Sequence, residues 1–326
     1  MGPPKLLSIV IPTLNRRAML EMTLDYLAAE IEGLEARVEL VVVNNASDDD
    51  TLEFLATRKA HVPARLVSFE ERVDIDSSFR RCVDVTTGRY INIFGDDDLP
   101  MPGFVRRIID ILDAGRNPAF IYFNRLIGDE ALRHVAEIAH PDHGVEVISF
   151  EVGKFISEFT HNPGFITSLV FDRHCWSEGE HFYSAGFQGY KFLARIYGGA
   201  SGRTCMYVGM PSLIQRRGVQ SWKREWPRYW LVNMPSLLVA LEDAGTTSGA
   251  FERWQRKEVT LRRVIIDCVA AKAYDYSVSD RFWVDASRFQ CKYRAILIQL
   301  VRFLVPRLLA RAVYFRRGKY KGNHIR

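Results

Sequence analysis

Short apolar runs alternate with amphipathic segments along the first 115 residues of the chain. The runs are rich in β-branched residues, which is typical of strands buried on both faces, and the segments between them repeat apolar residues at helical spacing. This alternation predicts βαβ units, a mostly parallel sheet and right-handed crossovers. The expected strands are residues 6–14, 38–43, 64–70 and 89–94, and the expected helices are 16–31, 48–59, 74–88 and 101–115.

After residue 127 the pattern is less regular. Residues 150–159 and 186–199 predict helices, and strands are expected within "NPGFITSLVFDRHCW" and "RTCMYVGMPSLIQ". The histidines of "LRHVAEIAHPDHGV" lack partners at metal-ligand spacing, so a solvated loop is expected there. From residue 223 the chain reads as helical. The sequence therefore predicts an α/β domain over residues 1–222 and a helical region over 223–326.

Polar residues follow each of the first four expected strands. In open parallel sheets, ligands bind outside the carboxyl ends of the strands, so these side chains are expected to share one rim. Asp48 and Asp50 are better explained as helix caps or solvent-exposed groups, and for Asp98 capping and chemistry remain open. The expected rim residues are Thr13, Asn15, Arg16, Asn44, Asn45, Asp74, Asp76, Asp96 and Asp97.

The stretch "GDDD" at 95–98 places three carboxylates side by side at the end of a buried strand. Their repulsion calls for a nearby positive group, and oxygen ligands suit Mg²⁺ or Mn²⁺. Such a metal is usually held by one or two protein carboxylates and by substrate phosphates, which implies a diphosphate substrate. Neither GxGxxG nor GxxxxGK[ST] occurs, which argues against a Rossmann dehydrogenase or a P-loop NTPase.

The succession "SIVIPTLNR", "ELVVVNNASDDDT" and "TTGRYINIFGDDDLPMP" resembles glycosyltransferase family 2, the inverting nucleotide-sugar enzymes of GT-A fold. The resemblance is specific over residues 6–115 and weaker to about 222. Within the family, "DID" ahead of "GRYINIFGDDD" is most similar to abequosyltransferase-type enzymes of O-antigen assembly. The resemblance implies metal-dependent transfer from a nucleoside-diphosphate sugar to a glycan or polyprenyl-diphosphate-linked saccharide during assembly of bacterial surface polysaccharide.

The resemblance also implies roles for individual residues. Asp97 stands at the metal-ligand position, Asp98 is a secondary ligand or cap, and Gly95 stands where relatives commonly have an aspartate. Mn²⁺ or Mg²⁺ is the expected cofactor. Arg216 and Arg217 would clamp the leaving diphosphate, because guanidinium groups carry a permanent charge with bidentate reach. The expected donor-binding set is Pro12, Thr13, Asn15, Arg16, Asn44, Asn45, Asp74, Asp76, Asp96, Arg216, Arg217 and Trp222.

The catalytic base is the point where the family pattern and this sequence differ. Relatives commonly supply a Glu-Asp pair at the start of a helix, where this chain has Gln188 and Gly189. Glu180 and His181 are the leading replacements for the base, and Asp172 is a more remote one. Two alternatives remain open at this stage: a catalytically silent nucleotide-sugar-binding module and a nucleotidyltransferase.

Basic residues are concentrated at the C-terminal end of the chain. The formal net charge is +5, yet residues 286–326 contain 11 Lys/Arg and no Asp/Glu. Leu297, Leu300, Val301, Leu304 and Leu308 are expected on one helical face, which suits either an anionic membrane surface or docking on the catalytic domain.

Other features of the sequence bear on location and partners. Neither a signal peptide nor a nucleic-acid-binding motif is recognised, and the odd number of cysteines without CxxC spacing suggests reduced thiols. A cytoplasmic protein, peripheral at the inner face of the cytoplasmic membrane, is therefore expected, without nucleic acid as a partner.

Overall fold

The structure is a computed structural model in which the chain forms two compact units. We call Met1–Phe155, Asn162–Tyr183 and Lys191–Val219 the sheet unit. We call Ile156–His161, Ser184–Tyr190 and Gln220–Arg326 the helical unit. The structure describes residues 5–58, 64–141, 144, 146–159, 164–183, 185–218, 224–277 and 279–320.

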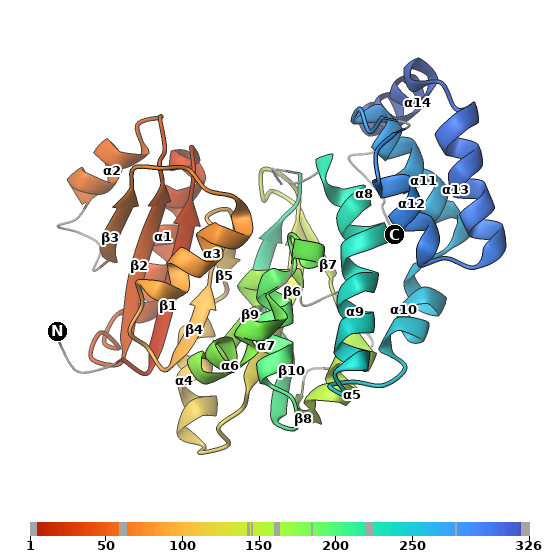
Figure 1. Cartoon of the computed structure of the whole chain (residues 1–326). Coiled ribbons are helices and arrows are strands. Elements are labelled where there is room, and N and C mark those ends of the chain that lie inside the picture. Colours follow the sequence, from red (N-terminus) through yellow and green to blue (C-terminus); the bar gives the residue numbers. More distant parts are fainter. Residues whose placement is uncertain are drawn as a thin grey trace. The chain divides into compact units, whose positions relative to one another are not determined.

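The first four strands of the sheet unit are parallel neighbours in the order β3-β2-β1-β4 (Figure 1). Their carboxyl ends therefore lie at one edge of the sheet, as the alternating pattern predicts. All four strands and the helices that follow them are confirmed. They are β1 (Leu7–Thr13), α1 (Arg17–Ile31), β2 (Val38–Asn45), α2 (Thr51–Arg58), β3 (Ala64–Phe69), α3 (Ile75–Asp84), β4 (Tyr90–Ile93) and α4 (Phe104–Asp113).

The rest of the sheet is mixed. Strand β9 pairs antiparallel with both β4 and β6, and β10 runs parallel to β6 and antiparallel to β5 and β8. The order across the sheet is β3-β2-β1-β4-β9-β6-β10-β5. These later strands are β5 (Leu99–Pro100), β6 (Phe120–Gly128), β7 (Val135–Ile138), β8 (Val147–Glu151), β9 (Leu169–Asp172) and β10 (Thr204–Arg216).

Helices cover both faces of the sheet. Apolar side chains of α1 and α4 pack on alternate residues of the parallel strands, such as Leu7, Ile9 and Ile11 in β1. Helix α3 contacts α7 (Lys191–Gly199) through Phe79 and Phe192, whose rings meet edge to face at 5.5 Å. Strands β1, β2 and β4 therefore bury both of their faces, which explains their nearly continuous apolar runs in the sequence.

The expected loop over residues 132–145 is wrong in part. Residues Val135–Ile138 form β7, which pairs with β6. His140 is buried, and its Nε2 atom lies 2.7 Å from the Tyr122 hydroxyl, so a protein partner satisfies this histidine in the core. His143 lies outside the described residues.

The helical unit is built around buried aromatic side chains, including Trp254 and Trp283. Within it, α11 contacts α13 and α14, and α12 contacts α13 (Figure 1). None of the described helices is both long enough and apolar enough to span a bilayer. The helices are α8 (Trp226–Arg228), a π-helical turn (Tyr229–Asn233), α9 (Met234–Asp243), α10 (Ala250–Glu258), α11 (Leu261–Ala273), α12 (Phe282–Arg288), α13 (Lys292–Leu304) and α14 (Arg307–Tyr320).

Three helices remain to be described, of which two directly follow strands of the sheet unit. Helix α5 (Val152–Phe159) follows β8, and α6 (Arg173–Glu178) follows β9. The predicted helix over 186–199 is confirmed from Lys191 onward, because Ala185–Phe187 forms a separate 3₁₀ turn.

Candidate active site

The Arg16 guanidinium lies between two of the three consecutive aspartates. Its Nη1 atom donates hydrogen bonds to Asp96 Oδ1 and Asp97 Oδ2, each at 3.0 Å. Arg16 follows β1 and the aspartates follow β4, and these strands are parallel neighbours. Burial alone would lower the pKa of Arg16, but the two carboxylates raise it above its usual value. A fixed cation thus offsets part of the carboxylate repulsion.

Asp96 is held from two sides. Thr13, at the end of β1, donates its hydroxyl hydrogen to Asp96 Oδ2 at 2.9 Å, while Arg16 binds the other carboxylate oxygen. Burial raises the pKa of Asp96 to about 6, against the opposite influence of Arg16. Both oxygens of Asp96 therefore have protein donors, and they fix the loop after β4 to the loop after β1.

Asp98 is enclosed by the protein. Its Oδ2 accepts a hydrogen bond from the Thr167 hydroxyl at 2.6 Å, and its Oδ1 accepts one from the Arg216 backbone N–H at 3.2 Å. Burial and the nearby charge of Asp97 raise the pKa of Asp98 to about 8. Since both oxygens are engaged in these bonds, the placement of Asp98 favours a structural role over metal binding.

Gly95 has a physical reason to differ from the aspartate common in relatives. A Cβ atom at this position would lie 2.7 Å from Asp98 Oδ2 and 3.2 Å from Thr167 Oγ1. The Gly95 backbone N–H also donates to that threonine hydroxyl at 3.1 Å. A side chain at residue 95 would therefore displace the bonds that hold Asp98 in place.

Of the three aspartates, Asp97 has the most exposed side chain. Its carboxylate is 15% exposed, against 7% for Asp96. Among the described residues, no three His, Cys, Asp or Glu side chains surround a common point where a metal could bind. Asp97 is thus the carboxylate of the loop that is open to solvent, and an oxygen ligand of this kind together with phosphate oxygens would suit Mg²⁺ or Mn²⁺.

The two arginines after β10 lie in different surroundings. Arg216 is buried, and it donates from Nε to the Asp97 carbonyl oxygen at 3.0 Å and from Nη1 to the Glu130 carbonyl oxygen at 2.8 Å. Arg217 is exposed and pairs with Glu137 of β7 at 2.9 Å. Arg216 thus positions the aspartate loop, while Arg217 lies at the surface. Trp222 is outside the described residues.

Asparagine side chains join the loops at the carboxyl ends of β1, β2 and β3. Asn15 Oδ1 accepts a hydrogen bond from the Asp48 backbone N–H at 2.9 Å. Asn45 forms a reciprocal pair with the Val73 backbone, at 2.9 and 3.0 Å. Asn44 is fully buried at the end of β2. The structure therefore brings these predicted donor-binding residues to one rim and gives them a part in shaping it.

Asp74 caps helix α3 at the same rim. Its carboxylate accepts hydrogen bonds from the backbone N–H groups of Asp76 and Ser77. Burial would raise the pKa of Asp74, but its bonds with Ser77 and Asp76 and the charge of Lys191 lower it. Lys191 opens α7 and lies 4.5 Å from the Tyr183 ring centre. Asp76 is buried, and Pro12 lies half-buried in β1.

The leading replacements for the base lie on a 3₁₀ turn, Gly179–Phe182. The Glu180 carboxylate is 62% exposed and lies between Arg80 of α3, at 3.7 Å, and Arg195 of α7, at 3.8 Å. His181 is exposed, and its Nδ1 atom lies 2.9 Å from the Glu178 carbonyl oxygen.

Asp172 lies away from the rim. It is opposite Tyr90 in the antiparallel pairing of β9 with β4, whereas the three aspartates follow the other end of β4. Its carboxylate pairs with Arg203 at 2.9 Å and caps α6. The structure therefore does not bring Asp172 together with Asp96 and Asp97.

Two threonines complete the aspartate loop, and neither is among the predicted site residues. Thr23 donates its single hydroxyl hydrogen toward the carbonyl oxygens of Asp96 and Asp98, at 3.0 and 2.9 Å. It is a polar residue on the apolar face of α1, which is a recognisable signal in the sequence. Thr167 lies in the 3₁₀ turn Ile166–Ser168, far along the chain, and carries no comparable signal.

A protein-family model supports the interpretation of this site. The model described as Glycosyl transferase family 2 matches residues 8–192, which is more than half of the chain. The chain belongs to glycosyltransferase family 2. The match includes the loops after β1, β2, β3 and β4 and therefore every residue of the aspartate loop described above. The narrower resemblance to abequosyltransferases is not confirmed.

Curated relatives match parts of this family 2 chain. A PGL/p-HBAD biosynthesis glycosyltransferase of Mycobacterium tuberculosis is 34% identical over 92 residues, which cover 28% of this chain and 35% of the relative. An uncharacterized protein of the same species is 32% identical over 109 residues, or 33% of each chain. The chain thus spans about a third of the length of these relatives.

Solved structures resemble nearly the whole chain. S. aureus TarS 1–349 in complex with UDP-GlcNAc has a TM-score of 0.59 at 12% identity, covering 98% of this chain and 93% of TarS 1–349. The mannosyltransferase PcManGT from Pyrobaculum calidifontis, in complex with GDP-Man and Mn²⁺, has a TM-score of 0.53 at 14% identity, with 98% and 88% coverage. At these identities the likeness shows the fold, and it confirms the predicted GT-A fold.

Proposed function

We propose that this glycosyltransferase moves a sugar from a nucleoside-diphosphate sugar to a hydroxyl of a saccharide acceptor, with inversion and with the help of Mg²⁺ or Mn²⁺. The observation that carries the proposal is the position of Asp97. It is a partly exposed carboxylate that follows β4, at the edge where the parallel strands end and where ligands bind in such sheets. The solved relatives with UDP-GlcNAc and with GDP-Man and Mn²⁺ support this choice of donor and metal.

The residues around Asp97 divide the work of donor binding. Thr13, Arg16 and Asp96 hold the aspartate loop in one conformation before the donor arrives, which lowers the free energy needed to order the site. A divalent cation at Asp97 would offset the negative charge of the leaving diphosphate. Asp74 and Asn45, with their neighbours at the rim, would form the wall against the nucleoside.

The proposed base is Glu180. Inversion requires a group that takes the proton of the acceptor hydroxyl as its oxygen attacks the anomeric carbon and the diphosphate departs. The exposed Glu180 carboxylate lies 3.7 Å from Arg80 and 3.8 Å from Arg195, and these two arginines hold it in place on its 3₁₀ turn. We propose a saccharide carried on a polyprenyl diphosphate as acceptor, in surface polysaccharide assembly of the O-antigen type.

A catalytically silent sugar-nucleotide-binding module is the second candidate, and one observation favours it. Gly189 has a φ of +80°, and a Cβ atom there would lie 2.7 Å from the Tyr229 ring. The position where relatives have the second acid of their Glu-Asp pair therefore has no room for a side chain without a local rearrangement. The usual base is absent for a structural reason, so donor turnover has to be measured directly.

The direct test is donor stabilisation and turnover by the purified chain. UDP-GlcNAc and GDP-Man, the donors of the two structural relatives, are added with and without Mn²⁺ while thermal unfolding and release of UDP or GDP are followed. An enzyme is expected to show a metal-dependent rise in Tm with one donor class and slow release of its diphosphate. A donor that raises the Tm but releases no UDP or GDP, whichever saccharide acceptor is added, would support the silent module. Neither effect with a broader donor panel would contradict the proposal.

A further inference from the structure

Exposed apolar side chains gather on one side of helix α13. Tyr293, Ile296, Leu300, Phe303 and Leu304 are all exposed, with Phe303 at 64% and Leu304 at 70%. Their spacing places them on one helical face, which we call the α13 face. Leu308, at the start of α14, is a further exposed apolar residue shortly after this helix in the sequence, at 80%. Exposed apolar clusters of this kind mark interaction surfaces.

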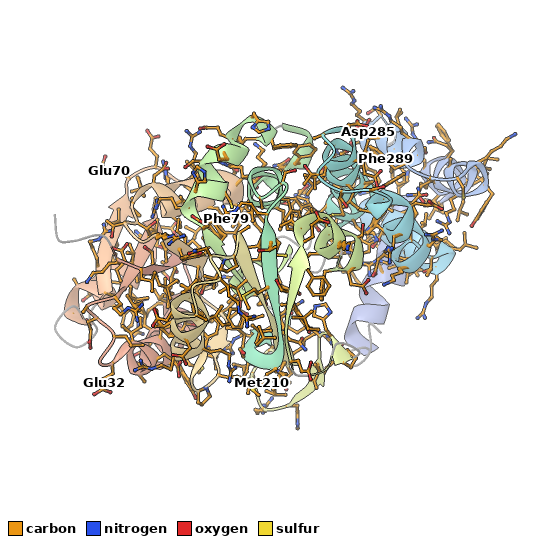
Figure 2. All side chains as sticks on the ribbon, turned by 90° about the horizontal axis from the view of Figure 1, so that it is seen from below. Glu32, Glu70, Phe79, Met210, Asp285 and Phe289 are labelled. Atoms are coloured by element: carbon orange, nitrogen blue, oxygen red, sulfur yellow. The ribbon has the colours of Figure 1, made fainter. Side chains whose placement is uncertain are left out.

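The opposite side of α13 is the one that packs in the helical unit. Ile298 and Val301 are buried, and the helix contacts α11 and α12. The face expected from the sequence included Val301, which is buried, whereas the exposed face includes Ile296 and Phe303 instead. Figure 2 labels Asp285 of α12 and Phe289 in the segment that leads into this helix. Helix α13 is therefore docked on one side and open on the other.

Positive charge accompanies the α13 face. A hollow of about 460 Å³ has Ile296, Leu300, Phe303 and Leu304 among its lining residues, together with Lys292. Among the described residues, no carboxylate forms an ion pair with Lys292 or with Arg294. Asp285 is the last acidic residue of the sequence, and 11 Lys/Arg follow it.

We propose that the α13 face lies on an anionic lipid bilayer, with its apolar side chains among the upper acyl chains and its basic residues at the headgroup phosphates. Apolar side chains beside lysine and arginine, without carboxylates, are the chemistry of helices that lie in a membrane interface. This association does not depend on the transferase reaction. It would keep the enzyme near an acceptor that is carried on a lipid.

Charge argues against a second copy of the chain as the occupant. In a two-fold symmetric pair, each copy of the face meets the same face, so the basic segments of both copies would come together. Asp275 pairs with Arg307 and Arg311 of this segment, but among the described residues no carboxylate pairs with Lys292 or Arg294 to offset the repulsion beside the α13 face. A bilayer rich in anionic lipid offers both apolar contact and negative charge.

The test is flotation of the full chain with vesicles of phosphatidylcholine alone or with phosphatidylglycerol added. Phe303→Ser combined with Leu304→Ser is expected to lower partition into anionic vesicles at least tenfold. The matched control is Leu261→Ser with Ile265→Ser, which removes two exposed apolar side chains from α11 of the same unit. Raised salt is expected to weaken wild-type binding, because the charges are exposed to solvent.

Three outcomes would overturn the proposal: equal partition of both double variants, equal binding to neutral and anionic vesicles, or no vesicle binding by the wild type. Light scattering tests whether a second copy of the chain covers the face. A dimer of the wild type that is lost in Phe303→Ser with Leu304→Ser, while lipid binding stays unchanged, would assign the face to a second copy. Matching thermal unfolding of the variants and wild type shows that the fold is retained.

Discussion

Arg16 Nη1 lies 3.0 Å from a carboxylate oxygen of Asp97, and it lies at the same distance from Asp96. One guanidinium therefore holds the residue expected to bind the metal and the carboxylate beside it. A cation bound at Asp97 would share this negative charge with Arg16. The stability of the loop without metal and its response to metal should both depend on Arg16.

Replacing Arg16 with Ala should destabilise the metal-free protein by about 1 kcal/mol, the scale of a hydrogen bond to a charged group at a partly exposed site. Mn²⁺ should then raise the Tm of this variant more than that of the wild type, because the metal replaces the missing positive charge. Arg17→Ala is the matched control, since Arg17 is adjacent and pairs loosely with Glu21 and Asp50. An identical Mn²⁺ response in wild type and Arg16→Ala would contradict this dependence.

Replacing Thr167 with Val should lower the free energy of unfolding by about 1–3 kcal/mol, because the change leaves the part-buried Gly95 N–H and the buried Asp98 Oδ2 atom without the threonine hydroxyl as a partner. Thr57→Val is the control, since Thr57 is exposed and bonds within its own helix. Urea unfolding measures both. A loss for Thr167→Val no larger than that for Thr57→Val would show that Thr167 does not hold the loop.

Asp267 in α11 should give the helical unit a pH-dependent stability. Burial raises the pKa of Asp267 to about 6, although Arg263 lies 2.8 Å away and opposes the shift. Its contribution to stability is thus fully present below about pH 4, the unfolded pKa, and is lost as the pH rises through 6. Between pH 4 and 7 the wild type should lose on the order of 3 kcal/mol relative to Asp267→Asn.

The pH measurement needs a variant with the same change in charge at another position of the helical unit. Asp285→Asn supplies it, because Asp285 is partly exposed on α12. Urea unfolding of all three proteins at several pH values gives the comparison. If the curves of wild type and Asp267→Asn stay parallel across this range, burial does not shift Asp267 as described.

Glu180→Gln should lower sugar transfer by roughly 10²–10⁴-fold while leaving donor affinity nearly constant, because it removes the proposed proton acceptor and keeps the side chain's size. Glu178→Gln is a close control, since Glu178 lies two residues away with nearly equal exposure. Steady-state kinetics and calorimetry separate the two effects. Equal losses in both variants, or none in either, would place the base elsewhere.

The parallel part of the fold could be predicted because its signals are local. Each strand from β1 to β4 is a compact apolar run, and the helix that follows it repeats its apolar residues at helical spacing. Strand β5 has two residues and exists because it pairs with Leu213 and Ile214 of β10, so its signal is not local. The segment Phe120–Gly128 carries an apolar start that would have permitted assignment of β6.

The candidate site was predictable as a set of positions but not as a set of contacts. Strand ends place Arg16 and Asp97 at one rim, yet the guanidinium bridge depends on how two loops meet in space. The role of Thr167 depends on a contact 69 residues distant from Asp98 in sequence. The exposed stripe of α13 depends on which side of an apolar helix packs, which helical spacing alone did not decide.

The most direct test of the account is calorimetric binding of Mn²⁺ and a donor, taken from the panel that stabilises the wild type, to Asp97→Asn. Asp113→Asn, which removes an equal charge from the exposed end of α4, is the control. Metal-dependent donor binding should be lost in Asp97→Asn and kept in Asp113→Asn, with both proteins folded. Unchanged binding of Mn²⁺ and donor by Asp97→Asn would contradict the assignment of the metal site.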